Sequence, residues 1–171
     1  MLIRPETPAD FPALHQFIKT AFETAKVSDG TEQDFVNKLR AGENYVPELA
    51  LMAEEDGRMI GHIMLTKTQI LTPDHNGQTV LILAPLSVLL AARGRGVGAL
   101  LVREAFKRAR ALGYGACVLV GDPAYYGRFG FEAMDRFGLK CKQEIPPQYT
   151  LAYELLPGAL KNAAGTVDFL G

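Results

Sequence analysis

The sequence lacks the features that mark several classes of protein. It has only two cysteines, Cys117 and Cys141, and they form no CxxC pair, which argues against a metal-binding framework. No apolar run approaches the roughly 18 residues needed to cross a bilayer, and the first residues lack the basic-then-apolar layout of a signal peptide. The net charge of −1 gives no general attraction to nucleic acid or membrane surfaces. We therefore expect a cytoplasmic protein with no metal and no nucleic-acid or membrane partner.

The composition is that of a chain with one well-filled hydrophobic core. Hydrophobic residues make up 48% of the sequence and charged residues 22%, which is typical of folded globular proteins. A length of 171 residues favours one domain, and neither an internal repeat nor a low-complexity tract divides it. We therefore predict a single domain over residues 1–171.

The spacing of apolar residues predicts strands and helices in an order that does not repeat. Thr7-Pro8 and Thr31 are typical starts of helices, and Asp56-Gly57 is a strong signal for a tight turn between antiparallel strands. The expected strands cover residues 2–4, 49–54, 59–66, 79–88, 116–120 and 149–156, with a short one at 167–170. A third helix begins at Val97, and its inward positions are Val97, Leu101, Ala105, Ala109 and Leu112.

This order predicts the α+β class (mixed α/β), with helices flanking a central, mostly antiparallel sheet. The exception is one strand pair. Residues 79–88 and 116–120 are joined by the third helix, so we expect them to pair in parallel through a right-handed crossover.

The most informative segment lies between the strand 79–88 and the third helix. Its glycines and arginines are Arg93, Gly94, Arg95, Gly96 and Gly98. Glycine has no Cβ, so the backbone of such a loop can come close to a ligand. The loop also leads into a helix N-terminus, where unpaired N–H groups and the positive end of the dipole attract anions. The segment therefore predicts a phosphate-holding turn for a phosphate-bearing cofactor.

Other phosphate motifs fit this loop less well. Gly94, Gly96 and Ala99 satisfy a degenerate dinucleotide fingerprint, but that fingerprint belongs at the first strand–helix turn of serial βαβ units. Here the loop comes midway, after antiparallel strands. A Walker-type loop is excluded because no Gly-Lys-Ser/Thr follows. A tight turn without a ligand remains the alternative when the loop is considered alone.

A second motif makes the interpretation more specific. Arg93, Gly96 and Gly98 match the pattern Arg/Gln-x-x-Gly-x-Gly/Ala, and Tyr126 with Gly130-Phe131 matches Tyr-x-x-x-Gly-Phe. In this order the two motifs resemble those of the GNAT N-acetyltransferase superfamily. The run 121–131 is especially similar to a subgroup of predicted acetyltransferases called YhbS-like. Residue-level matching is strong from about residue 84 to residue 131.

The resemblance implies acetyl-CoA as the acetyl donor. Backbone N–H groups from Arg95 to Ala99 would hold the pyrophosphate, and Arg93 would either contact a phosphate or brace the loop. The end of the preceding strand would bind the pantetheine arm in a cleft where this strand splays from the strand 116–120. The implied cofactor-binding residues are Leu86, Ser87, Val88, Arg93, Gly94, Arg95, Gly96, Val97, Gly98 and Ala99.

The resemblance also implies direct attack of an amine on the thioester. Tyr126 matches the tyrosine that protonates the leaving thiolate, and a phenol suits this role because it is neutral at pH 7. The alternative is that its ring packs under the cofactor and its hydroxyl only donates a hydrogen bond. The neighbouring Tyr125 could exchange roles with it. Arg128 could contact a cofactor phosphate, but we expect it to be solvated.

The general base is not evident from the sequence. Many relatives carry a carboxylate on the strand before the loop, whereas residues 79–88 contain no acid. The candidates are Glu55, His62, Asp122 and a chain of ordered water. A lone histidine on a strand is more often structural, and Asp122 before Pro123 is typical of a residue that caps a turn.

Two functional readings remain open. One is an N-acetyltransferase that acts on a small amine or on a protein amino group. The other is a non-catalytic module, regulatory or structural in function, that binds acetyl-CoA or another acyl-CoA. The missing strand carboxylate favours it and Tyr126 argues against it. Pairing of C-terminal strands across subunits could give a homodimer.

Overall fold

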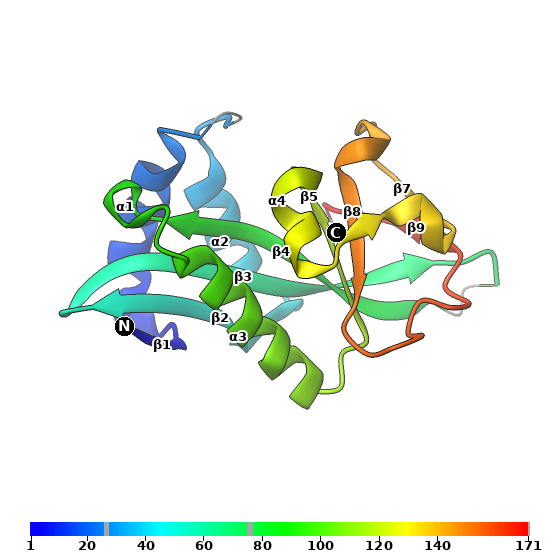
Figure 1. Cartoon of the computed structure of the whole chain (residues 1–171), viewed down its shortest axis with the longest axis horizontal. Helices are drawn as coiled ribbons and strands as arrows, with labels where there is room; N and C mark the ends of the chain where they lie inside the picture. Colours follow the sequence, from blue (N-terminus) through cyan, green and yellow to red (C-terminus); the bar gives the residue numbers. More distant parts are fainter. Residues whose placement is uncertain (26–27, 75–76, 171) are drawn as a thin grey trace. The chain divides into compact units, whose positions relative to one another are not determined.

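The structure is a computed structural model that describes residues 1–25, 28–74 and 77–170. Figure 1 shows the arrangement of its elements along the chain. The strands are β1 (Leu2–Pro5), β2 (Tyr45–Glu55), β3 (Arg58–Leu71), β4 (Gln78–Val88), β5 (Ala116–Val120), β6 (Glu132–Ala133), β7 (Leu139–Cys141), β8 (Thr150–Glu154) and β9 (Gly165–Val167). The helices are α1 (Phe11–Phe22), α2 (Glu32–Ala41), α3 (Val97–Ala111) and α4 (Pro123–Tyr126), with short 3-10 turns η1 (Pro8–Asp10), η2 (Leu90–Ala92), η3 (Gly127–Phe129), η4 (Met134–Phe137) and η5 (Pro147–Tyr149).

The strands form a sheet in the order β1-β2-β3-β4-β5-β8-β6, and β9 pairs with both β3 and β7. The predicted mixed α/β class with a mostly antiparallel sheet is confirmed. The predicted parallel pair is also confirmed, because Leu81 lies opposite Cys117 and Ile82 opposite Val118 in a parallel β4–β5 ladder. A second parallel pair, β7 with β9, was not predicted. The splay of β4 from β5 stays a prediction.

The chain divides into two compact units, and each is described by itself. Unit 1 comprises residues 1–66 and 84–108, and unit 2 comprises residues 67–83 and 109–171. The strands β3 and β4 and the helix α3 each contribute residues to both units. The single domain over residues 1–171 stays a prediction.

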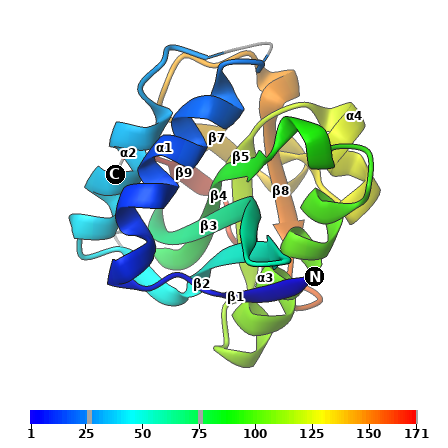
Figure 2. The same cartoon turned by 90° about the vertical axis from the view of Figure 1, so that its left-hand side faces the viewer.

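In unit 1 the helices α1 and α2 lie side by side over the strands β2 and β3 (Figure 2). A cluster of Ile18, Val36, Ala50 and Met64 buries the contact between these four elements. Strand residues alternate between the two faces of a sheet, so the residue Gly61 faces the other way. A Cβ added there would lie 2.8 Å from Leu101 Cδ1, which places α3 against that opposite face.

The predicted tight turn joins β2 to β3. Asp56 and Gly57 both have positive φ angles, 51° and 75°, as the favoured two-residue hairpin turn requires. The first of these strands is longer than predicted, since β2 begins at Tyr45 rather than at residue 49. The ladder shifts register between Tyr45 and Ala50, and this irregularity accommodates Pro47, which has no N–H to donate.

Unit 2 has its own hydrophobic core under β5, β8 and β9. Its buried members are Ile70, Val80, Ala116, Val118, Met134, Leu139, Ala152, Leu160, Ala163 and Val167. The predicted strand β5 is confirmed with its bounds. The short strands β6 and β7 and the helix α4 were not predicted.

Three predictions at the edges of unit 2 were wrong. The last strand is β9, not 167–170, because Asp168 Oδ1 accepts the N–H of Leu170 and bends the chain. The strand β8 ends before Leu155 and Leu156, whose N–H groups both bond to Gly115 O. Leu112 is 47% exposed rather than inward, because α3 ends at Ala111 and the chain then turns.

Candidate functional site

The end of β4 leads into the glycine loop within unit 1. Leu86 and Val88 are half-buried, and Ser87 is buried with 3% of its surface exposed. Its hydroxyl has no hydrogen-bond partner among the residues that the structure describes. The N–H of Leu89 then bonds to Ile60 O at 2.8 Å, which fixes the end of β4 against β3.

The glycines of the loop serve its backbone conformation and leave its surface open. Gly94 and Gly96 have φ angles of +79° and +80°, a left-handed conformation that other residues adopt only with strain. A Cβ added at either position would meet no atom within 4 Å. The surface beside both glycines is therefore free of protein atoms that a ligand would have to displace.

The helix α3 presents its positive end directly after these glycines. Leu100 donates to Gly96 O at 3.0 Å, the first bond of the helical ladder. The N–H groups of Val97, Gly98 and Ala99 precede it and have no partner inside the helix. Three donors at the positive end of a 15-residue helix favour an anion.

Arg93 braces the loop. Its Nε donates to Val88 O at 3.1 Å, and its two terminal nitrogens donate to Thr24 Oγ1 at 2.9 Å and to Ala21 O at 2.8 Å. The guanidinium therefore joins the end of β4 to the last turn of α1. Arg95 instead makes an exposed ion pair with Glu55 at 2.5 Å, so one candidate general base is held by a loop arginine.

The tyrosine motif lies in unit 2 and is shaped by close contacts. Asp122 Oδ1 accepts the N–H of Ala124 at 2.9 Å, which confirms that this residue caps the start of α4. A Cβ on Gly121 would lie 2.6 Å from Tyr126 Cε2. Gly130 has a φ of +97°, and a Cβ there would lie 2.7 Å from Tyr153 Cε1. Both glycines are therefore needed for aromatic rings to approach the backbone.

The ring of Tyr126 is held by other aromatic rings. It packs edge to face on Tyr125 and on Phe131, with centroid distances of 4.9 and 5.8 Å. Burial is the main cause that raises the pKa of Tyr126 above its ordinary value of 10.0, so the phenol stays protonated at neutral pH. Arg128 is exposed as predicted, and its guanidinium also lies over the Tyr125 ring at 4.5 Å.

His62 is fully buried in a charged cluster that the sequence did not indicate. Its Nε2 lies 3.1 Å from Glu6 Oε1, and Arg40 Nε donates to Glu6 Oε2 at 2.6 Å. Burial alone would raise the pKa of Glu6, but the hydrogen bonds from His62 and Arg40 outweigh it and lower the pKa below 4.5. The only sequence signal was the histidine itself, because its partners lie 56 and 22 positions away.

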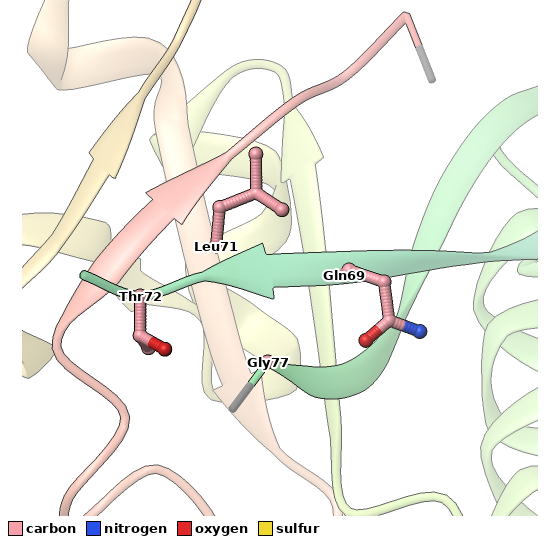
Figure 3. Close-up of a pocket in the computed structure, with 4 residues that line it drawn as sticks. All are labelled: Gln69, Leu71, Thr72 and Gly77. Carbon is pink, nitrogen blue, oxygen red and sulfur yellow. The ribbon is translucent and has the colours of Figure 1, made fainter. Parts of the chain in front are cut away.

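A shallow pocket of about 210 Å³ lies elsewhere, in unit 2, and is lined by Gln69, Leu71, Thr72 and Gly77 (Figure 3). None of these side chains is ionisable, and none belongs to the predicted site.

Across the described ranges 1–25, 28–74 and 77–170, no three His, Cys, Asp or Glu side chains are grouped so that they could hold a metal ion. Within the same ranges, no helix combines the length and the apolar character that crossing a membrane requires.

Comparison with known proteins adds independent findings. A family model described as an acetyltransferase (GNAT) domain matches residues 2–134. The chain is 32% identical to the uncharacterized N-acetyltransferase YhbS of Escherichia coli K12 over 99% of its length and 96% of that protein. A crystal structure of E. coli YhbS in complex with CoA is similar, with a TM-score of 0.87, 30% identity, and coverage of 98% of this chain and 88% of that one. A GNAT family acetyltransferase from Brucella melitensis in complex with acetyl-CoA has a TM-score of 0.78 and 32% identity, with coverage of 97% and 93%.

Proposed function

Since the chain belongs to the GNAT acetyltransferase family, we propose that it transfers an acetyl group from acetyl-CoA to a primary amine. The observation that carries this proposal is the open glycine loop at the start of α3. Its left-handed glycines leave free surface beside the donor end of a helix, which is the arrangement that a pyrophosphate needs. The relatives from E. coli and B. melitensis, solved with CoA and acetyl-CoA, support the choice of cofactor.

The loop residues fit a cofactor that carries phosphates. The N–H groups from Arg95 to Ala99 would hold the pyrophosphate, with Gly94 and Gly96 giving the backbone its shape. Arg93 would act indirectly, because its guanidinium already bonds to α1 and to the end of β4. The backbone of Leu86, Ser87 and Val88 would bind the pantetheine arm, and Val97 would lie under the phosphates.

The chemistry follows from the groups of this chain. The acceptor amine attacks the thioester carbonyl carbon, a C–N bond forms, the C–S bond breaks, and the nitrogen loses a proton to solvent water. The N–H near Val88 would stabilise the negative charge that develops on the carbonyl oxygen. Tyr126 would donate a proton to the leaving sulfur, and its raised pKa keeps that proton in place at neutral pH.

A specific observation supports a second candidate, a non-catalytic acyl-CoA-binding regulatory module. The strand β4 contains no carboxylate. Glu55 is paired with Arg95, and Asp122 caps α4. A binding module would keep the glycine loop and take up acetyl-CoA without transferring the acetyl group. A cytoplasmic location and a homodimer stay predictions for both candidates.

Calorimetric titration of the purified chain with acetyl-CoA, and separately with NAD and ATP, tests the binding claim. Selective binding of acetyl-CoA is expected, and its absence in folded protein would refute both candidates.

Thiol release from acetyl-CoA, measured with spermidine and with a lysine-containing peptide, then distinguishes the acetyltransferase from the binding module. Tyr126→Phe should lower turnover about 100-fold, since proton donation contributes a factor of this order, with acetyl-CoA affinity unchanged. Tyr125→Phe tests the neighbouring tyrosine, which could exchange roles with Tyr126, in the same way. Equal turnover of Tyr126→Phe and the wild type would exclude Tyr126 as the donor.

A further inference from the structure

The aromatic contacts of Tyr126 continue beyond the tyrosine motif as an aromatic row made of Tyr126, Phe131 and Tyr153. The ring of Phe131 lies between the two tyrosine rings, with centroid distances of 5.8 Å to Tyr126 and 5.6 Å to Tyr153. Phe131 is buried and comes just before β6, whereas Tyr153 lies on β8. The strands β6 and β8 are paired, with Glu132 opposite Ala152. The row therefore connects the proposed proton donor to a strand inside the sheet.

The far end of the aromatic row is held by an arginine in the last turn of α3. Arg110 Nη2 donates to the hydroxyl of Tyr153 at 3.0 Å, and its Nε donates to Leu155 O at 2.9 Å. The guanidinium carbon also lies 6.0 Å from the centroid of the Tyr153 ring. A guanidinium is planar and rigid, so two simultaneous hydrogen bonds fix its orientation. Arg110 therefore restrains the hydroxyl end of the Tyr153 ring.

Each tyrosine ring of the row also lies against the backbone of a glycine. A Cβ on Gly121 would lie 2.6 Å from Tyr126 Cε2, and a Cβ on Gly130 would lie 2.7 Å from Tyr153 Cε1. Such distances are too short for any side chain, so both glycines allow a ring to approach. The two rings are therefore confined between backbone on one side and the ring of Phe131 on the other.

The remaining ring contact of Tyr126 is local. The Tyr125 ring is adjacent in the chain, with a centroid distance of 4.9 Å, and Arg128 lies over that ring and donates to Tyr125 O at 3.0 Å. These residues belong to α4 and η3, the same short segment as Tyr126, so they would move together with it. The aromatic row instead joins the Tyr126 ring to α3 and to β8, which has a strand on each side.

Resting on the proposed function, we propose that Arg110 and Tyr153 are positioning residues that hold the Tyr126 hydroxyl where it can protonate the thioester sulfur. A proton donor has to lie within about 3 Å of the atom that it protonates. The phenol oxygen is the atom of Tyr126 furthest from the backbone, so a tilt of the ring moves it most. A displacement of about 1 Å can lower a rate about 100-fold. Arg110 and Tyr153 therefore act on the reaction through Phe131.

Carbon NMR of the tyrosine ring carbon that bears the hydroxyl tests the positioning without any substrate. The chain has six tyrosines, and Tyr126→Phe identifies the signal of Tyr126. Tyr153→Phe keeps the ring and removes the hydroxyl that Arg110 binds, so it should shift or broaden the Tyr126 signal, and Arg110→Gln should do the same. The control is Phe137→Leu, which removes a ring packed on the core of unit 2 outside the aromatic row. An unchanged Tyr126 signal in Tyr153→Phe and Arg110→Gln, or an equal change in Phe137→Leu, would overturn the proposal.

Kinetics with spermidine and a lysine-containing peptide test whether the effect passes through Tyr126. Phe131→Leu stays apolar but breaks the row, so it should lower kcat about 10-fold, part of the roughly 100-fold that proton donation contributes, without changing KM for acetyl-CoA. Tyr153→Phe and Arg110→Gln should each lower kcat about threefold on the same scale. In the Tyr126→Phe background the same substitutions should leave kcat unchanged, because residues that act as a unit are not additive. Equal losses in both backgrounds would show a merely structural role and overturn the proposal.

The positioning and the proposed function fail in different ways. Failure of acetyl-CoA to bind would refute the proposed function. Wild-type turnover in Tyr126→Phe would exclude Tyr126 as the donor, and with it any role of Arg110 and Tyr153 in proton transfer. If acetyl-CoA binds but neither amine is acetylated, the NMR result decides whether these two residues position the Tyr126 ring.

Discussion

The glycine loop of unit 1 and the tyrosine motif of unit 2 use glycine for opposite purposes. In the loop, Gly94 and Gly96 are required by their positive φ angles, and the space where a Cβ would be is open. In the tyrosine motif, the space beside Gly121 and Gly130 is filled by the rings of Tyr126 and Tyr153. The first arrangement leaves room for something that is not protein, whereas the second fixes a side chain.

The two regions also differ in what holds them. Arg93 and Arg95 hold the loop through directional, charged hydrogen bonds. The tyrosine motif is held by edge-to-face contacts among aromatic rings. Glycine content alone therefore does not identify a ligand site, and what surrounds each glycine separates a binding surface from a packing surface.

The largest effect is expected from Gly96→Glu. A negative charge beside the phosphates should cost several kcal/mol of binding energy, which corresponds to a loss of acetyl-CoA affinity of about 100-fold or more. Gly158→Glu is the matched control, because Gly158 has the same left-handed φ, +78°, and equally open surroundings in the loop after β8. Calorimetry on both folded variants makes the comparison, and equal affinities would show that the glycine loop is not the phosphate site.

Gly121→Ala tests the tyrosine motif, where the ring of Tyr126 fills the space beside the glycine. The added methyl group overlaps the Tyr126 ring, and such overpacking costs about 1–3 kcal/mol of unfolding free energy. The displaced ring should also reduce turnover while acetyl-CoA affinity is unchanged. Gly127→Ala is the control, since Gly127 has a helical conformation and a Cβ there meets nothing within 4 Å. Denaturant melts in which both variants match the wild type would contradict the filled environment of Gly121.

Arg93 and Arg95 should contribute unequally to stability. Arg93→Ala removes three hydrogen bonds between elements and should cost about 1–2 kcal/mol. Arg95→Ala removes one exposed ion pair and should cost at most about 0.5 kcal/mol. Urea unfolding of the two variants measures the difference. If Arg95→Ala lost more unfolding free energy than Arg93→Ala, Arg93 could not be the residue that braces the loop.

The smallest effect is a shift in the ionisation of Tyr126. Burial raises its pKa, so the neutral phenol should persist to a higher pH than the 10.0 of a free tyrosine. An ultraviolet difference titration between the wild type and Tyr126→Phe isolates this group. Its midpoint should lie above 10.0, and any alkaline loss of turnover that depends on Tyr126 should lie there too. A midpoint below 10.0 would mean that the ring is not held among the others as described.

The sequence predicted well the features that local signals determine. The end of β4 at Val88, the start of α3 at Val97 and the hairpin at Asp56-Gly57 all follow from glycine placement and apolar periodicity, and each is confirmed. The cap at Asp122 was predicted for the same reason, because a capping aspartate acts on residues beside it in the chain.

Features that depend on distant partners were not predicted. The strands β6 and β7 have two and three residues, and they exist because β8 and β9 pair with them. The burial of His62 against Glu6 and Arg40 joins residues from β3, from α2 and from the segment directly after β1. Nothing in the neighbourhood of any one of them indicates a charged cluster, so only the fold brings them together.

The attachment of Arg93 to the last turn of α1 has a consequence for how this chain can vary. The guanidinium bonds to the backbone oxygen of Ala21 and the hydroxyl of Thr24, so the position of the turn matters more than the side chain at residue 21. Thr24 follows the end of α1 at Phe22, so one residue inserted between Ala21 and Thr24 would move the Thr24 hydroxyl away from Ala21 O and separate the two acceptors. A change of chain length at this turn would therefore disturb the glycine loop as well, and the end of α1 and the loop would have to be transplanted into another scaffold as one piece.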